Sequence, residues 1–402
     1  MPASWRERLS EGRIVPYYQP IVSVETQAIA AYEALGRHIV GPEVRSLGPF
    51  FQAAGTEPGQ ADLRRDVDRT LRLNALTHFA SLDRPGFRLF LNVMPRLMVD
   101  HLIHRPDQLP WTLKLMAEIG VDPKRVVIEL TEEAVGEQTE SLRRLVDIYR
   151  AHGCGIAVDD VGAEASNLDR IGYFEPDIIK IDALMLRRSL RERSFRQVLR
   201  GVSTMAEGLG SALLFEGVET EEELHQALDF GARYIQGWYF SKAAPDFLPE
   251  LSFAENLKPV LRSFGNRIVG QAERLKQRIR KTMETLGRPP TPIPLQSGTW
   301  GYGPTALDAW VDVACRVFLT DQSGFQVSPN FETSPEGWKT NPAGLGRCRS
   351  IRPYFPGSGD SRWSVSDAYY DVNDRSLLRT YTRPTEAGLV LFVDVLEIEN
   401  QG

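Results

Sequence analysis

Short apolar runs alternate with longer amphipathic segments from about residue 14 to residue 240. The segments between the runs, such as ADLRRDVDRTLRLNALTHFA, have helical periodicity. Strands that alternate with helices favour parallel pairing, and about eight βα units in one domain predict a closed α/β barrel of the (β/α)8 type, with an open doubly wound sheet as the alternative. The runs are IVPYYQPIVSV, IAAYEALGR, FRLFLNVMP, RVVIELTEE, GIAVDDVG, PDIIKID, ALLFEGVE and RYIQGWYFS.

The pattern changes after residue 250. Residues 251–286 have the periodicity of one helix with Arg and Lys on its polar face, and RPPTPIPLQSG cannot continue that helix because proline removes N–H donors and fixes φ. Beyond it, ACRVFLTDQSGFQVS predicts a hairpin, and LVLFVDVLEI predicts a further antiparallel strand. We therefore expect a barrel (1–250), a linker helix (251–286) and a small α+β domain (287–402).

Composition narrows the choice of function. The chain is 42% hydrophobic and 25% charged, as in ordinary globular proteins, and its net charge of −6 argues against a general nucleic-acid binder. Three cysteines without metal-ligand spacing predict neither a disulfide framework nor a zinc site. The N-terminus lacks the apolar stretch of a signal peptide, and no run approaches the ~20 residues that span a bilayer, so we expect a cytoplasmic protein.

A polar or charged residue follows most of the apolar runs directly. The carboxyl ends of barrel strands meet at one mouth, so we expect these residues to face a common cavity. Oxygen ligands without His or Cys favour Mg²⁺ or Mn²⁺ over zinc. The residues in question are Glu33, Asn92, Glu129, Asp159, Asp160, Lys180, Glu216 and Gln236.

Asp159 and Asp160 are the most informative of these residues. Neighbouring carboxylates can serve two metal ions, and such a pair of ions activates water and stabilises the leaving oxygen in phosphodiester cleavage. Lys180 would then neutralise developing charge, and Glu216 would act as a general base or a metal ligand. Each residue alone also has an ordinary explanation, such as a turn, a helix cap or a solvated lysine. Their recurrence at the same place in the βα unit favours the shared site.

The motifs YYQPI, YEALGR, LNVMP, IELTE, VDDVG, IKID, FEGVET and YIQGWYFSK, in this order over about residues 10–245, resemble those of the EAL-domain phosphodiesterases. That resemblance implies hydrolysis of cyclic di-GMP to linear pGpG with two Mg²⁺ or Mn²⁺ ions, a first barrel strand antiparallel to the others, and a homodimer. The segments SLGPFF, SNLDRI and RPYF further resemble the two-domain YkuI type, which implies a PAS-like regulatory domain after the barrel, with an unknown small ligand or protein as its partner.

The resemblance also implies a role for each matching residue. The ligands of the first metal would be Glu33, Asn92, Glu129 and Asp159. Asp160 and Glu216 would bind the second metal or activate the attacking water, and Lys180 would position that water. Supporting acids would be Glu132 and Glu219. The positions at or near the bound dinucleotide would be Gln19, Leu35, Arg37, Asp182 and Gln236.

The stretch after the aspartate pair departs from the family pattern. Active members usually read like DDFGTGYSSL, whereas this chain has DDVGAEASNL, and Gly36 replaces the usual bulky residue of the EAL motif. Since that loop helps to order the second metal, the departure favours an alternative function, a receptor that binds cyclic di-GMP without useful hydrolysis. A barrel hydrolase that acts on another phosphodiester is a third hypothesis. In the tail, Arg349 or Arg352 with nearby tryptophans would form either an anion pocket or an ordinary core.

Overall fold

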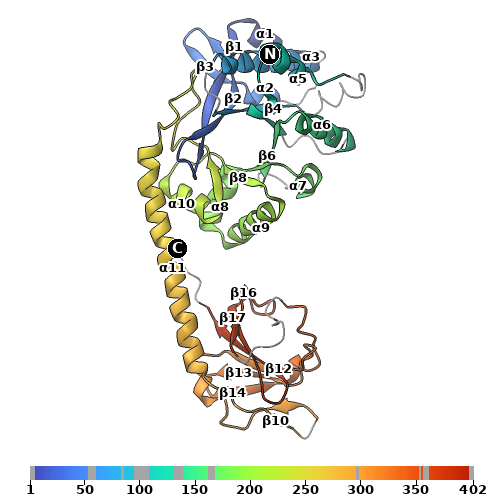
Figure 1. Ribbon diagram of the computed structural model, residues 1–402, viewed down its shortest axis with the longest axis vertical. Helices are drawn as coiled ribbons and strands as arrows, with labels where there is room; N and C mark the ends of the chain where they lie inside the picture. The colour runs from blue at the N-terminus through green and yellow to red at the C-terminus, as the bar shows by residue number, and fades with distance from the viewer. Residues whose placement is uncertain are drawn as a thin grey trace. The chain divides into compact units, whose positions relative to one another are not determined.

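The computed structural model describes residues 5–52, 60–82, 86–94, 108–130, 139–161, 168–295, 298–352, 355 and 362–397. The chain divides into two compact units, Met1–Asn266 and Arg267–Gly402. Figure 1 labels the elements of both units. Within the described residues, no helix is long and apolar enough to cross a membrane.

Eight strands of the first unit close into a barrel. The strands described in this unit, all of them in the barrel except β3, are β1 (Arg13–Ser23), β2 (Ile29–Val40), β3 (Glu43–Ser46), β4 (Arg88–Val93), β5 (Val126–Leu130), β6 (Gly155–Val161), β7 (Ile178–Ile181), β8 (Ala212–Phe215) and β9 (Ala232–Ile235). Their order is β1-β9-β8-β7-β6-β5-β4-β2, and the pairing of β1 with β2 completes the ring, while β3 extends from β2. The closed barrel predicted from the alternating pattern is therefore confirmed, and the open sheet is excluded.

The first strand runs against the rest of the barrel. β1 is antiparallel to both β2 and β9, whereas β2, β4, β5, β6, β7, β8 and β9 pair with one another in parallel. This confirms the antiparallel first strand that the family resemblance implied. The periodicity of the chain carries no signal for strand direction, because the side chains of a strand alternate in the same way whichever way it runs.

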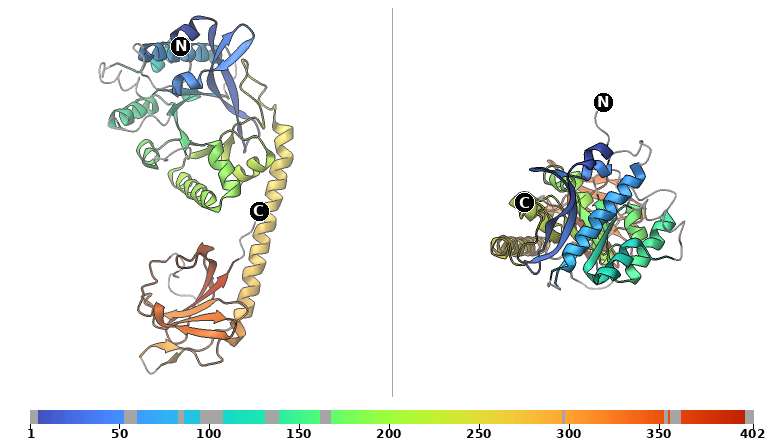
Figure 2. Two further views of the ribbon diagram at one scale, coloured as in Figure 1. Left: turned by 180° about the vertical axis from the view of Figure 1, so that it is seen from behind. Right: turned by 90° about the horizontal axis from the view of Figure 1, so that it is seen from above.

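Helices surround the strands (Figures 1 and 2). Their apolar positions repeat at helical spacing, as in Leu199, Val202 and Ala206, which are all buried. The helices of this unit are α1 (Trp5–Ser10), α2 (Gly48–Gln52), α3 (Gln60–Ala80), α5 (Trp111–Ile119), the 3₁₀ turn η1 (Pro123–Arg125), α6 (Thr139–Ala151), α7 (Leu168–Phe174), α8 (Ala183–Arg191), α9 (Arg193–Leu209) and α10 (Glu221–Asp229).

A single long helix, α11 (Ala254–Leu286), contributes to both units. Leu257 and Val260 in its first half are buried in the core of the barrel unit. Ile279, Met283 and Leu286 in its second half pack in the core of the other unit. Apolar side chains of α11 therefore pack in the core of each unit.

The second unit is built on an antiparallel sheet. Its strands are β10 (Ile293–Pro294), β11 (Trp300–Gly301), β12 (Arg316–Thr320), β13 (Asn330–Ser334), β14 (Gly337–Asn341), β15 (Ser364–Val365), β16 (Tyr369–Tyr370), β17 (Leu377–Pro384) and β18 (Val390–Leu396), with short 3₁₀ turns at Asp308–Trp310 and Pro342–Gly344. The main sheet has the order β14-β13-β12-β18-β17-β15, with β16 also on β17. This sheet confirms a small C-terminal sheet domain, and α11, which the sequence predicted as a separate linker helix, also contributes to its core.

The hairpin predicted around the Ser-Gly turn is present but short: the N–H of Asp321 donates to the carbonyl of Phe325 and the N–H of Val327 to that of Leu319, both at 2.9 Å. Thr320 faces Gln326 across that turn, but the ladder partners of β12 are β13 and β18. Along β12, Val317 and Leu319 join the core shared with α11, while Phe318 points to the other face and stacks on Phe392 at 4.8 Å between ring centroids. Both faces of β12 are therefore buried, and the strand lies inside the sheet between β13 and β18.

Candidate metal centre

The strand pleat places the predicted site residues on one side. The interior of the barrel is filled by a cluster that includes Ala31, Phe90, Val127, Ala157, Ile178 and Leu214. Side chains two residues apart on a strand point to the same face. Two residues beyond each of these apolar residues, the chain carries Glu33, Asn92, Glu129, Asp159, Lys180 and Glu216. On the antiparallel β1 the order is reversed, and Gln19 precedes the interior residue Ile21 by two.

Lys180 lies at the centre of four carboxylates. Its Nζ forms ion pairs with Glu129 and Glu216, and lies 3.2 Å from Asp159 Oδ1 and 3.6 Å from Glu33 Oε2. Lys180 and Glu129 are almost completely buried, at 1% and 0% exposure of their side chains. The structure therefore brings together, at one end of the barrel, five residues that lie on five different strands or directly after them.

Burial and crowding shift the acid–base properties of this cluster. Burial raises the pKa of Glu129 and of Glu216 well above the usual value, and neighbouring carboxylates add to the effect. Burial alone would lower the pKa of Lys180, but the four carboxylates outweigh it and raise that pKa well above its usual value. Lys180 therefore stays protonated near neutral pH, and this one ammonium group has four carboxyl groups around it.

Amide side chains hold the carboxylate of Glu33. Asn92 Nδ2 donates to Glu33 Oε1 at 2.9 Å, and Gln236 Nε2 donates to Glu33 Oε2 at 2.8 Å. The same Gln236 nitrogen lies 3.2 Å from Gln19 Oε1, and Gln19 donates in turn to the backbone carbonyl of Ser241. Because both oxygens of Glu33 have a donor, the orientation of this carboxylate is fixed.

The cluster fits a divalent metal ion. Glu33, Glu129 and Glu216 each bring one carboxylate oxygen to within 4.8 Å of the others. Glu129 Oε2 is buried and accepts no hydrogen bond from the described residues. A buried carboxylate oxygen without a donor is costly, and a hard cation with oxygen ligands would satisfy it. The donor set of carboxylates and one amide favours Mg²⁺, Mn²⁺ or Ca²⁺ over zinc.

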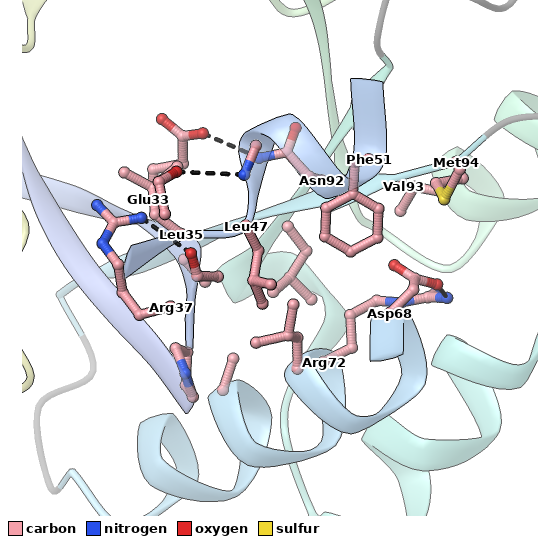
Figure 3. A pocket seen from close by; sticks show the side chains of 18 of the residues that line it. Glu33, Leu35, Arg37, Leu47, Phe51, Asp68, Arg72, Asn92, Val93 and Met94 are labelled. Carbon is pink, nitrogen blue, oxygen red and sulfur yellow. Dashed lines mark hydrogen bonds and ion pairs between the residues drawn. The ribbon is translucent and has the colours of Figure 1, made fainter. Parts of the chain in front are cut away.

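A pocket of about 340 Å³ opens beside this cluster (Figure 3). Glu33, Leu35 and Arg37 lie on one side of it (Figure 3), and Asn92 and Asp159 also line it. Arg37 donates to the carbonyl of Gly36 at 3.0 Å, and its guanidinium lies 5.8 Å from the ring centroid of Tyr17. The acidic cluster is thus continuous with a cavity large enough for an organic ligand.

Two other predicted residues have partners outside the cluster. Asp182 caps α8, since its carboxylate accepts a hydrogen bond from the backbone N–H of Leu184 at 2.7 Å. Glu219 is about half exposed, and its Oε1 lies 3.0 Å from an Arg187 nitrogen. Glu132, the side chain of Asp160 and residues 162–167 of the unusual loop lie outside the described residues.

The other side of the pocket holds an ion pair that the sequence analysis missed. Asp68 and Arg72 are both buried, and they form an ion pair on α3 that lines the cavity with Phe51 (Figure 3). Burial raises the pKa of Asp68, and the nearby guanidinium opposes that rise. The i, i+4 spacing of Asp and Arg was the available signal, but that spacing is common on exposed helix faces.

The tail arginine and tryptophans serve mainly in packing. Arg349 donates through Nε and a terminal nitrogen to Gln326 Oε1, and its guanidinium lies 5.0 Å from the centroid of the Phe318 ring. Trp310 is buried in the core of the second unit, and its Nε1 donates to the carbonyl of Leu286. Trp300, Trp338 and Trp363 pack against the same core, which favours the core interpretation over an anion pocket.

Known proteins resemble the chain in both of its parts. Residues 3–243 match the family model described as the EAL domain, and residues 305–397 match that of an EAL-domain associated signalling protein domain. YkuI of Bacillus subtilis, described as an uncharacterized EAL-domain containing protein, is 30% identical over 395 residues, which cover 95% of this chain and 94% of YkuI. The cyclic di-GMP phosphodiesterase RocR of Pseudomonas aeruginosa is 33% identical over 133 residues, 33% of this chain and 34% of RocR.

A solved structure supports the same assignment. The crystal structure of B. subtilis YkuI in complex with substrate c-di-GMP and calcium has a TM-score of 0.80 to this chain at 28% identity. The match covers 96% of this chain and 97% of the YkuI chain. The likeness therefore extends over the barrel, α11 and the C-terminal sheet.

Proposed function

Because the chain belongs to the EAL-domain family, we propose that it is a metal-dependent phosphodiesterase that hydrolyses cyclic di-GMP to linear pGpG. The observation that carries the proposal is the buried cluster of Glu33, Glu129, Asp159 and Glu216 around Lys180. Four largely buried carboxyl groups around a single lysine lower the stability of a fold. Catalysis at a metal ion held by these carboxylates would explain why the protein has them.

The matched residues suggest how the ions would be held. Glu33, Asn92, Glu129 and Asp159 would hold one ion, while Asp160 and Glu216 would hold a second. Two Mg²⁺ or Mn²⁺ ions would lower the pKa of a water molecule and neutralise charge on the phosphodiester. Glu132 would support this set.

The chain's own residues would do the rest. Lys180 would donate an N–H to the attacking oxygen, and Glu216, which pairs with Lys180, would either take the proton from the water or help to hold the second ion. Leu35 and Arg37 line the cavity beside the cluster, where the guanidinium can donate two hydrogen bonds to the phosphodiester. Gln19 and Gln236 hold Glu33 in place from the closing strands, and Asp182 would lie near the dinucleotide at the start of α8.

A receptor for cyclic di-GMP is the second candidate. One observation favours it, the sequence GAEASNL after Asp160 in place of the usual loop. Ligands of the first metal can be complete while a second ion is poorly ordered, because the residues around the ligands tune metal affinity. A receptor would use the same pocket and the same first-metal ligands.

The product assay separates the two candidates. Wild-type protein with Mg²⁺ or Mn²⁺ should convert cyclic di-GMP to pGpG, resolved by liquid chromatography, and Glu33→Ala should abolish that turnover because it removes the carboxylate on which Asn92 and Gln236 converge. Glu25→Ala is the matched control, since Glu25 forms only a surface ion pair with Arg233, of a kind worth about 0–1 kcal/mol. Binding of cyclic di-GMP by the wild type without any product would instead establish the receptor.

The proposal also covers the role of the C-terminal unit and the number of chains in the assembly. We propose that the C-terminal unit regulates the barrel in response to a small ligand or a protein, and that the chain acts as a homodimer in the cytoplasm. The match of residues 305–397 to a domain associated with EAL signalling proteins supports the regulatory part. Sedimentation of the intact chain tests the dimer.

A further inference from the structure

The backbone that follows Glu216 is tightly confined. The N–H of Glu216 donates to the carbonyl of Ile181 at 3.0 Å, which ties the end of β8 to the end of β7. Gly217 has φ of +57°, in the left-handed region that favours glycine, and a Cβ there would lie 2.7 Å from the Cβ of Ala183. The chain therefore brings Gly217 next to Ala183, the first residue of α8.

Arg187 reaches this segment from α8. One of its terminal nitrogens donates to the carbonyl of Gly217 at 3.0 Å and lies 3.0 Å from Glu219 Oε1. Its Nε donates to Glu223 Oε1 at 2.8 Å. A single guanidinium thus contacts two residues of the stretch that connects Glu216 to α10 and one residue of α10 itself, in the planar geometry for which arginine is suited and lysine is not.

Glu223 holds the same stretch from the other side. Its second oxygen accepts hydrogen bonds from the backbone N–H groups of Glu219, at 2.7 Å, and Thr220, at 3.3 Å. Thr220 completes a capping box by accepting from the N–H of Glu223. Burial alone would raise the pKa of Glu223, but these donors and Arg187 outweigh it and lower that pKa, so the carboxylate stays charged.

We infer that Arg187 is a positioning residue for Glu216, through a clamp formed by Arg187, Gly217, Glu219 and Glu223. The clamp fixes the backbone from Gly217 to Thr220 and so sets where the carboxylate of Glu216 enters the acidic cluster beside Lys180. Glu219 then supports the site through Arg187 rather than by touching a metal ion. The inference rests on the proposed metal site, but it concerns residues that have no metal contact of their own.

The test is a double-mutant cycle read out by Mn²⁺ affinity in calorimetry. Arg187→Gln should weaken Mn²⁺ binding by ~10- to 100-fold, the usual effect of losing a group that orients a ligand. Arg187→Lys should recover only part of that loss, because an ammonium cannot reach Gly217 and Glu223 in one plane. In a Glu216→Gln background, Arg187→Gln should have no further effect. A loss of equal size in both backgrounds would overturn the inference, since Arg187 would then act independently of Glu216.

Arg196→Gln controls for general destabilisation. Arg196 also donates two hydrogen bonds to backbone carbonyls, those of Ser189 and Leu190, but near the last turn of α8. The Arg196→Gln variant should leave Mn²⁺ affinity unchanged. Equal losses of Mn²⁺ affinity in Arg196→Gln and Arg187→Gln would contradict a specific role of Arg187. In the wild type, Mn²⁺ binding without formation of pGpG would refute the proposed hydrolysis alone, because the calorimetric cycle still decides the role of Arg187.

Discussion

Gly36 leaves room for two leucines beside the proposed site. A Cβ at position 36 would lie 2.8 Å from Leu71 Cδ1 and 3.2 Å from Leu47 Cδ1. Both leucines line the pocket that adjoins Glu33. A larger residue at position 36 has to displace them, so this one glycine helps to set the shape of the cavity.

We predict that Gly36→Leu weakens cyclic di-GMP binding while leaving Mn²⁺ affinity close to that of the wild type. The added side chain forces Leu47 and Leu71 to move, and overpacking of this kind costs about 1–3 kcal/mol. Titration calorimetry with the dinucleotide and with Mn²⁺ separately measures both effects. Gly48→Ala is the control, because its Cβ would meet only Ser46 Oγ, at 3.4 Å, on the wall of the same pocket. Unchanged dinucleotide affinity in Gly36→Leu would refute the prediction.

At the scale of elements, a buried ion pair network joins three parts of the C-terminal sheet. Arg316 of β12 contacts Asp394 of β18 at 2.7 Å and Asp371, just after β16, at 2.5 Å. Burial alone would raise the pKa of Asp371, but hydrogen bonds from Asn373 and the pair with Arg316 outweigh it and lower that pKa. A lowered folded-state pKa contributes stability above the unfolded-state pKa, about 3.9 for Asp, and that stability is lost as the pH falls through the folded-state value.

The expected consequence is an acid-sensitive C-terminal domain. In urea unfolding followed by tryptophan fluorescence, the wild type should lose stability as the pH falls from about 5 towards the lowered folded-state pKa of Asp371. Asp371→Asn should lose less over the same interval, because it has no carboxylate to protonate. Asp367→Asn, at an exposed position of the same segment, should behave like the wild type. Identical pH dependence in the two variants would show that Asp371 does not contribute.

The sequence predicts the barrel strands and the residues at their ends, but it does not predict the contacts between helices around the site. The apolar runs predict each barrel strand, and the residue two positions beyond an interior residue predicts Glu33, Glu129 and Lys180, because the pleat has a period of two. The sequence does not predict that Arg187 clamps the segment after Glu216, since that contact joins two helices whose packing follows only from the closed barrel. The ion pair of Asp68 and Arg72 was not predicted for another reason: it lies within α3, and its i, i+4 spacing is equally common on exposed helix faces.

At the scale of the whole molecule, the two units have separate cores but share α11. Leu257 and Val260 are buried with the barrel, so a chain that ends at residue 250 would lose part of its core, whereas one that ends at Asn266 would keep it. The domain boundaries drawn at 250 and 286 remain predictions. Any test of regulation by the C-terminal unit should therefore truncate the chain after Asn266.

We predict that the chain truncated after Asn266 keeps Mn²⁺ binding but turns over cyclic di-GMP at a rate different from that of the intact chain. Mn²⁺ should raise the thermal midpoint of the truncated chain, since a ligand that binds only the folded state stabilises it. In the intact chain, calorimetry should show two transitions, of which Mn²⁺ shifts only the barrel's. Equal turnover of both forms would exclude regulation by the C-terminal unit under the assay conditions.

The antiparallel first strand has a consequence for biosynthesis. β1 pairs at once with its neighbour β2, but its other edge stays open until β9 has been made. The hydrogen bond from Gln236 to Glu33 joins residues 203 positions apart. A ribosome-bound chain that lacks β9 therefore exposes the strand edges of β1 and β8, which can mispair, and Glu33 lacks its hydrogen bond from Gln236. If the barrel closes only after β9 has been made, we expect the hydrogen bond that orients Glu33 to form late, together with closure of the ring.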